Sequence, residues 1–191
     1  MVAHSSFTLG GKRAEELGLL YLKRETEKLL LPGTRDKTVS VPGRHGVYDF
    51  GADLDARTFT LVCAIVAKTS AELEAIVRTL SGHLLYSNGS PKLLSLVFDE
   101  EPDKEYFVRY SGSTAIRRII MSGKLTLPLL AADPHAYGAE QEVEQVVEGS
   151  PENVEVQSDG NTETPPFIVL KNEGLNTING FVIRYYEEIE E

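Results

Sequence analysis

The sequence predicts a mainly β protein of the α+β class, in which a sheet carries one amphipathic helix. Three observations predict this fold class. Residues 58–68 form a continuous apolar run of strand length, residues 93–98 and 105–110 read as a pair of strands, and residues 70–85 carry apolar side chains at helical spacing.

The run TFTLVCAIVAK (58–68) predicts a central strand. One face would carry Phe59, Leu61, Cys63 and Ile65, and the other would carry Thr58, Thr60, Val62, Ala64 and Val66. A strand that is apolar on both faces is usually covered on both, so we expect other elements on each side of it.

The helix predicted over residues 70–85 has a start signal and one apolar stripe. Thr69 and Glu72 have the spacing of a capping box, and the run ends before the turn signal Asn88-Gly89. The stripe consists of Leu73, Ile76, Val77, Leu80 and Leu84. We therefore expect this helix to lie on the sheet.

The next segments predict further strands. Residues 93–98 and 105–110 form a hairpin across the charged loop 99–104. Residues 118–130 form two short strands, or one strand with a break at Gly123, and Pro128 places its end at a sheet edge. The first forty residues contain a strand with glycines followed by a segment whose pattern does not decide between helix and strand.

Charge divides the chain into two parts. Of the net charge of −10, the last 53 residues carry thirteen acids against Lys171 and Arg184, which leaves the first 138 residues at +1. We predict a first domain at 1–138, then an acidic linker and a partial β domain at 139–191 with strands at 167–172 and 181–186. Neither part has the basic surplus that stable nucleic-acid binding requires.

The stretch SVPGRHGVYDFG (40–51) raises the question of a phosphate-binding loop. Such a loop leads into a helix N-terminus, whereas Gly43 and Gly46 lead into residues that alternate like a strand. The residues Pro42 and Gly43 favour a tight turn between strands.

No other constellation predicts catalysis or a cofactor. His4, His45, His83 and His135 lack ligand spacing, and Cys63 lies within an apolar strand. The acids of residues 99–105 do not have the spacing of a calcium loop and favour a solvated hairpin tip. We expect no catalytic residue, metal or cofactor, and no signal peptide or membrane span is recognisable, so the chain is expected to fold in a cytoplasm.

The order of segments resembles the N-terminal domain of the distal tail protein (Dit) family of siphophages and prophages of Gram-positive bacteria. The resemblance covers residues 5–138, from FTLGGKRAEELGLLYLK to GKLTLPLLAADPHAYG. Seven residues carry the family signature: Pro42, Gly43, Arg44, Gly46, Arg57, Asp133 and Pro134.

The resemblance implies a β-sandwich-like domain with one helix packed on it and a first forty residues made of strands. It also implies a structural role without enzymatic activity. Six copies would form a ring at the hub of the baseplate, in the tail tip of the virion. The ring would bind the tail tube and tape-measure proteins, the tail-tip hub protein and receptor-binding proteins, while DNA passes through without being bound and no membrane is contacted. We expect the ring contacts to involve strand edges and the PGRHG turn region.

The family commonly has a second β-sandwich domain, of which residues 156–191 resemble the opening strands. We expect a truncated, naturally short or decayed second domain here. One alternative function is a carbohydrate-binding module with Tyr48, Phe50, Tyr106 and Tyr110 as a stacking platform. A second is a phage hydrolase, for which no acid/base pair is recognisable.

Overall fold

The computed structural model describes residues 5–27, 29, 31–114, 116–119, 122–147, 149, 153–156, 160–162 and 164–184. It divides into two compact units, residues 1–142 and 143–191. The mainly β class with a single α-helix in the described residues is confirmed. None of the helices in these ranges is long and apolar enough to span a membrane.

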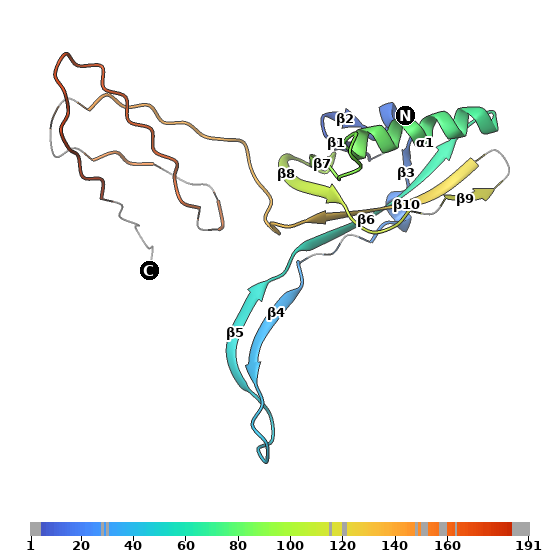
Figure 1. Ribbon diagram of the computed structural model, residues 1–191, viewed down its shortest axis with the longest axis horizontal. Helices are drawn as coiled ribbons and strands as arrows, with labels where there is room; N and C mark the ends of the chain where they lie inside the picture. The colour runs from blue at the N-terminus through green and yellow to red at the C-terminus, as the bar shows by residue number, and fades with distance from the viewer. Residues whose placement is uncertain are drawn as a thin grey trace. The chain divides into compact units, whose positions relative to one another are not determined.

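The first unit is built on an eight-stranded sheet (Figure 1). Seven strands follow the order β2-β1-β7-β8-β10-β6-β3, and β9 pairs with β10. Their bounds are β1 Phe7–Leu9, β2 Lys12–Arg13, β3 Leu20–Tyr21, β6 Arg57–Val66, β7 Leu93–Phe98, β8 Glu101–Tyr110, β9 Ile116–Ile119 and β10 Ser122–Ala131. All printed strand pairs in this sheet are antiparallel.

The sheet curls so that β1, next to one end of the strand order, contacts β3 at the other end, which makes the domain sandwich-like. Strands β1 and β3 lie far apart in the strand order, yet the rings of Phe7 and Tyr21 pack edge to face with centroids 5.3 Å apart. The segment between these strands forms a 3₁₀-helix, Ala14–Leu17, and buries Leu17 and Leu19 inside the curl. A second 3₁₀-helix, Lys23–Glu25, follows β3. The N-terminal residues thus contain the short strands that the family resemblance implied, but two 3₁₀-helices lie between them.

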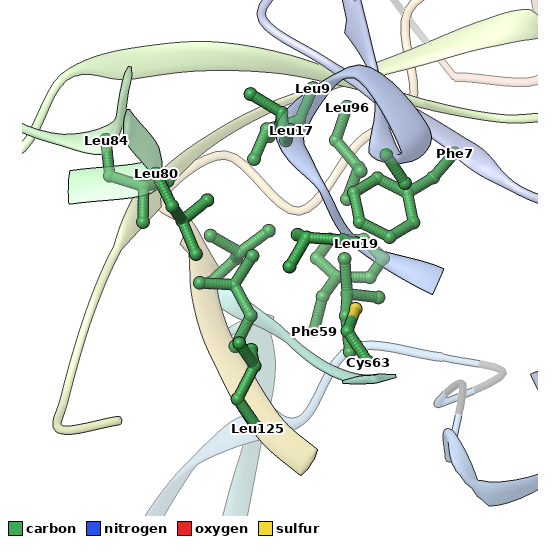
Figure 2. Packing of buried hydrophobic residues seen from close by; sticks show 14 of the residues in the cluster. Phe7, Leu9, Leu17, Leu19, Phe59, Cys63, Leu80, Leu84, Leu96 and Leu125 are labelled. Atoms are coloured by element: carbon green, nitrogen blue, oxygen red, sulfur yellow. The ribbon is translucent and has the colours of Figure 1, made fainter. Parts of the chain in front are cut away.

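Helix α1 (Ser70–Leu84) matches its predicted position. The Thr69 hydroxyl accepts a hydrogen bond from the Glu72 backbone N–H at 3.1 Å, and the Glu72 carboxylate accepts from the Lys68 N–H at 2.7 Å. Leu73, Leu80 and Leu84 are buried. Figure 2 shows Leu80 and Leu84 facing a cluster that includes Leu125 of the sheet. Burying this stripe is the main stabilisation of such a helix in a protein.

Strand β6 is covered along one face and only in the middle of the other, which corrects part of the prediction for residues 58–68. Phe59, Leu61, Cys63 and Ile65 are buried on the first face. On the other face Thr58, Thr60 and Val66 are exposed, Ala64 is half-buried and Val62 is buried. Two of the three exposed residues on the second face are threonines, which lose little by contact with water. In the first unit, helix α1 packs only against the first face.

The predicted loop between β7 and β8 was too long, and one of the two alternatives for residues 118–130 was wrong. Strand β8 starts at Glu101, so the turn between β7 and β8 is only Asp99-Glu100. Charged residues can continue the strand because the main-chain pairing of Phe98 with Glu101 does not depend on side-chain charge. The described residues within 118–130 belong to two strands, β9 and β10, as one alternative predicted. The other alternative, a break at Gly123, is wrong, because Gly123 lies inside β10 and pairs with Ile65.

Pro128 is also not at a sheet edge, because β10 lies between β6 and β8. The Pro128 carbonyl accepts a hydrogen bond from the Ser111 N–H. Because the nitrogen and the carbonyl of a strand residue point to the same side, the Pro128 nitrogen faces the side of β8 as well. On that side β9 pairs with residues 122–125 and β8 pairs with 129–130, and the missing donor interrupts neither pairing.

The second unit has no regular strand in its described residues. Residues 167–172 and 181–184 were predicted as strands but run as irregular chain (Figure 1), and residues 185–186 lie outside the described ranges. Phe167 and Val182 are 93% and 82% exposed. Two strands without a covering layer bury too little apolar surface to be stable. The boundary at residue 138 and the domain assignment stay predictions.

Candidate functional site

A two-stranded ribbon extends from the main sheet and contains the PGRHG turn. Strands β4 (Thr34–Val39) and β5 (Tyr48–Leu54) pair only with each other, and Figure 1 shows them reaching away from the other strands. We call residues 34–54 the arm. The interpretation of residues 42–46 as a turn between strands is confirmed.

The arm is exposed along its whole length. Every arm residue is exposed except Asp53, which is half-buried. Its exposed large apolar side chains are Val39, Val41, Val47, Tyr48, Phe50 and Leu54. Isolated apolar residues are common on protein surfaces, but a ribbon that exposes six of them together is typical of a binding surface.

Backbone geometry shapes the arm. Gly43 and Gly46 have φ values of 83° and 80°, which favour glycine at the tip. A register shift opposite Lys37 places Gly51, with φ 88°, in a bulge, and the Gly51 N–H donates to the Asp49 carboxylate at 2.9 Å. A bulge increases the local twist of a ribbon and turns its edge.

One face of the arm carries charge and the tip carries a stacked pair. Lys37 Nζ lies 2.6 Å from Asp53 Oδ1, and this hydrogen bond lowers the pKa of the Asp53 carboxyl below its ordinary value. At the tip, the Arg44 guanidinium carbon lies 3.8 Å from the ring centroid of Tyr48. Such a cation–π contact orders two exposed side chains.

The base of the arm is fastened to the sheet. The Asp55 N–H donates to the Gly33 carbonyl at 2.8 Å, so the two ends of the arm lie together. Arg57 begins β6 next to the arm, is 9% exposed, and donates from Nη2 to the Leu29 carbonyl at 2.8 Å. Leu29 lies in the segment that leads into β4, so Arg57 holds the entry to the arm.

The signature residues occupy two places in the fold. Pro42, Gly43, Arg44 and Gly46 form the tip of the arm. Arg57 pairs with Ala131 at one end of the β6–β10 ladder, and Asp133-Pro134 follow directly after that end. The structure therefore places Arg57 and Asp133 at the end of the sheet where the arm begins. The four signature residues of the turn lie at the opposite end of the arm, at its tip.

The sequence did not single out Tyr137. Its backbone exchanges two hydrogen bonds with Glu105 of β8, each 2.8 Å long, and its hydroxyl donates to the Asp133 carboxylate. The spacing of Asp133 and Tyr137 in DPHAYG was the available signal, but it indicates contact only once the turn is known.

The four aromatic residues of the carbohydrate-platform alternative do not share a surface. Tyr48 and Phe50 are exposed on the arm, whereas Tyr106 is 4% exposed and packs against Phe59 with centroids 5.0 Å apart. Tyr110 is half-buried against the core. This platform is wrong for these residues, because Tyr106 belongs to the inward face of β8.

Three residues that the sequence analysis considered for chemistry are buried or form ion pairs. Burial raises the pKa of the Cys63 thiol to about 12. Asp99 forms an ion pair with Arg13 at 2.8 Å, and Glu100 forms one with Lys23 at 2.6 Å. Within the described ranges, no three His, Cys, Asp or Glu side chains are grouped so that they could hold a metal ion.

The first unit thus combines a curled β domain with an exposed two-stranded arm. The family described as the phage tail protein RIFT-related domain matches residues 16–131, and the chain belongs to this family. No curated protein matches the chain.

Among solved structures, the chain is similar to the Dit protein of SPP1. That structure is described as a paradigm of the hub adsorption apparatus in phages that infect Gram-positive bacteria. The identity is 18%, the TM-score is 0.59, and the match covers 71% of this chain and 52% of that chain. The two proteins share a fold, and this chain spans about half the length of the solved one. The resemblance stated from the sequence is confirmed at the level of family and fold.

Proposed function

We propose that the chain is a non-enzymatic, ring-forming hub component of a siphophage tail tip. Membership of a phage tail family and the fold shared with a hub protein support the class. The exposed arm is the observation that carries the proposal, because it gives the chain a surface made for a second copy.

The arm needs a partner for two physical reasons. A two-stranded ribbon is marginally stable alone in water, and this one leaves its large apolar side chains exposed. Its two outer edges also present unpaired backbone groups that a neighbouring strand can use. If each copy binds the next through the same contact, the assembly closes into a ring. Six copies are the number that the family resemblance implies.

The finer parts of the proposal follow from the family. The ring would join the tail tube and tape-measure proteins to the tail-tip hub and receptor-binding proteins, with DNA passing through its channel unbound. The seven signature residues would serve this role structurally, at the arm's tip and base. The protein would be made in the bacterial cytoplasm and act in the virion.

A role without catalysis agrees with the chemistry of the first unit. The Cys63 thiol stays protonated at neutral pH because its pKa is about 12, so it is a poor nucleophile. The two acids of the β7–β8 turn form ion pairs with Arg13 and Lys23.

The experiment is light scattering on a sizing column over a concentration series, with negative-stain images of the peak. A ring of six chains of 21.0 kDa has a mass of 126 kDa. We expect ring-shaped particles near this mass at high concentration. A monomer at every concentration would contradict self-assembly of this chain.

An arm-deleted variant tests whether the arm makes the contact. Gly33 and Asp55 are hydrogen-bonded neighbours, so a short Gly-Ser linker can replace residues 34–54 without moving β6. This variant should remain a folded monomer. The matched control is Val66→Ser, which removes a 71% exposed apolar side chain outside the arm and should leave the ring intact. Rings formed without the arm would show that another surface makes the contact.

A further inference from the structure

The segment that leaves the first unit is tied to the side of strand β8. The Tyr137 N–H donates to the Glu105 carbonyl and the Glu105 N–H donates to the Tyr137 carbonyl, both at 2.8 Å, which forms an isolated antiparallel bridge. The rings of Tyr137 and Phe107 pack with centroids 5.5 Å apart. Tyr137 therefore continues the sheet by a single residue.

Asp133 holds this bridge in place. Its carboxylate accepts hydrogen bonds from the Tyr137 hydroxyl, from the His135 backbone N–H at 3.0 Å and from His135 Nδ1 at 2.7 Å. One side chain thus orders the whole turn from 133 to 137. The Tyr137 hydrogen bond is the largest cause of a lowered pKa at Asp133, which indicates that the carboxylate form is the one that is bound.

The edge of β8 beside Tyr137 is otherwise open in the described part of the chain. Strand β8 pairs with β7 on one side, and on the other side with β10 at Arg109 and Tyr110 alone. Alternate residues direct their backbone groups to the same side of a strand. Since Glu105 faces this edge and the pairing with β7 is regular from Glu105 onward, the backbone groups of Phe107 face it too. Open edges of this kind attract further strands.

We propose that residues 133–137 form a releasable latch that fastens the exit of the chain to the β8 edge, with Asp133 as its catch. When closed, the latch fixes where the chain leaves the sheet and covers the backbone of Glu105. When open, it frees the β8 edge and the ring of Phe107 for another strand. Opening is local, because Asp133 and Tyr137 are exposed and the latch holds the sheet through one bridge. This device does not depend on ring formation.

Amide hydrogen exchange on the full chain tests the latch. The reporters are the amides of Glu105 and Tyr137, because each donates to the other residue. In the unchanged chain we expect both to exchange together, and faster than the protected amides of the β6–β10 ladder. In Asp133→Asn we expect both rates to rise about tenfold, as for loss of a hydrogen bond to a charged group.

Two further variants separate the causes. Tyr137→Phe keeps the ring and the backbone bridge but removes the hydroxyl donor, so it should also raise both exchange rates. Asp103→Asn removes an exposed carboxylate from the same strand and should leave them unchanged. The latch is overturned if the two amides exchange only with global unfolding. It is also overturned if Asp133→Asn changes them no more than Asp103→Asn does.

Discussion

The guanidinium carbon of Arg57 lies 5.1 Å from the ring centroid of Tyr106, inside the curl of the sheet at the base of the arm. Arg57 also lies 5.3 Å from the ring centroid of Phe59 and donates to the Leu29 carbonyl. A charged side chain is buried at this point because aromatic faces and a carbonyl replace its water. The contact connects the core to the segment that enters the arm.

Arg57→Ala should destabilise the first unit by about 2–3 kcal/mol, since it removes a buried hydrogen bond from a charged group together with its packing. Urea unfolding measures the free energy of unfolding. The control is Arg109→Ala on the exposed face of β8, which should stay within about 0.5 kcal/mol. A loss at Arg57 as small as that at Arg109 would show that the entry to the arm does not depend on Arg57.

Two glycines with nearly the same φ angle distinguish the effect of backbone strain from that of a steric clash. Gly18 has φ 73° and a Cβ there would lie 2.8 Å from Ile76 Cγ2 of helix α1, whereas Gly11 has φ 76° and no atom within 4 Å of a Cβ. Gly11→Ala should cost about 1–2 kcal/mol through left-handed backbone strain alone. Gly18→Ala should cost about 1–3 kcal/mol more, because the helix must shift. Thermal or urea unfolding compares the two variants, and equal losses would argue against close contact of residue 18 with α1.

The buried Cys63 thiol reports on unfolding of the sheet. Burial raises its pKa to about 12, so almost no thiolate exists at neutral pH. We expect a thiol-specific reagent to label the folded chain only as fast as the domain opens, and the urea-unfolded chain at once. Rapid labelling in the absence of urea would mean that β6 is accessible in the native state.

Local patterns predicted the elements that depend on local chemistry. The helix starts where Thr69 and Glu72 cap it, and β7 occupies residues 93–98 as expected, because these signals lie within a few residues of each other. The turn at residues 42–46 followed in the same way from Pro42 and Gly43.

The exposure of each face could not be predicted, because it depends on distant partners. Val66 and Leu61 belong to one apolar run, yet Val66 is 71% exposed and Leu61 is 1% exposed. Tyr48 and Tyr106 looked alike in sequence, but one lies on the arm and the other in the core. Pro128 fits beside β8 because β9 pairs with residues 122–125 and β8 with residues 129–130, so neither pairing needs an N–H from Pro128. The register of these three strands could not be read from the sequence.

The latch predicts a specific dependence on pH. The hydrogen bond from the Tyr137 hydroxyl is the first cause that holds the pKa of the Asp133 carboxyl below its ordinary value of 3.8. A group whose pKa is lowered by folding adds stability above its unfolded pKa, and this stability is lost as the pH falls through the folded value. The latch should therefore be fully closed at neutral pH and weaken only in acid, below the ordinary pKa of an aspartate. Carboxyl NMR titration of Asp133 should give a midpoint below 3.8 in the unchanged chain and a higher one in Tyr137→Phe. Equal midpoints in the two chains would mean that the hydroxyl does not bind the carboxylate in solution, and the Asp133 catch would then consist of its bonds to His135 alone.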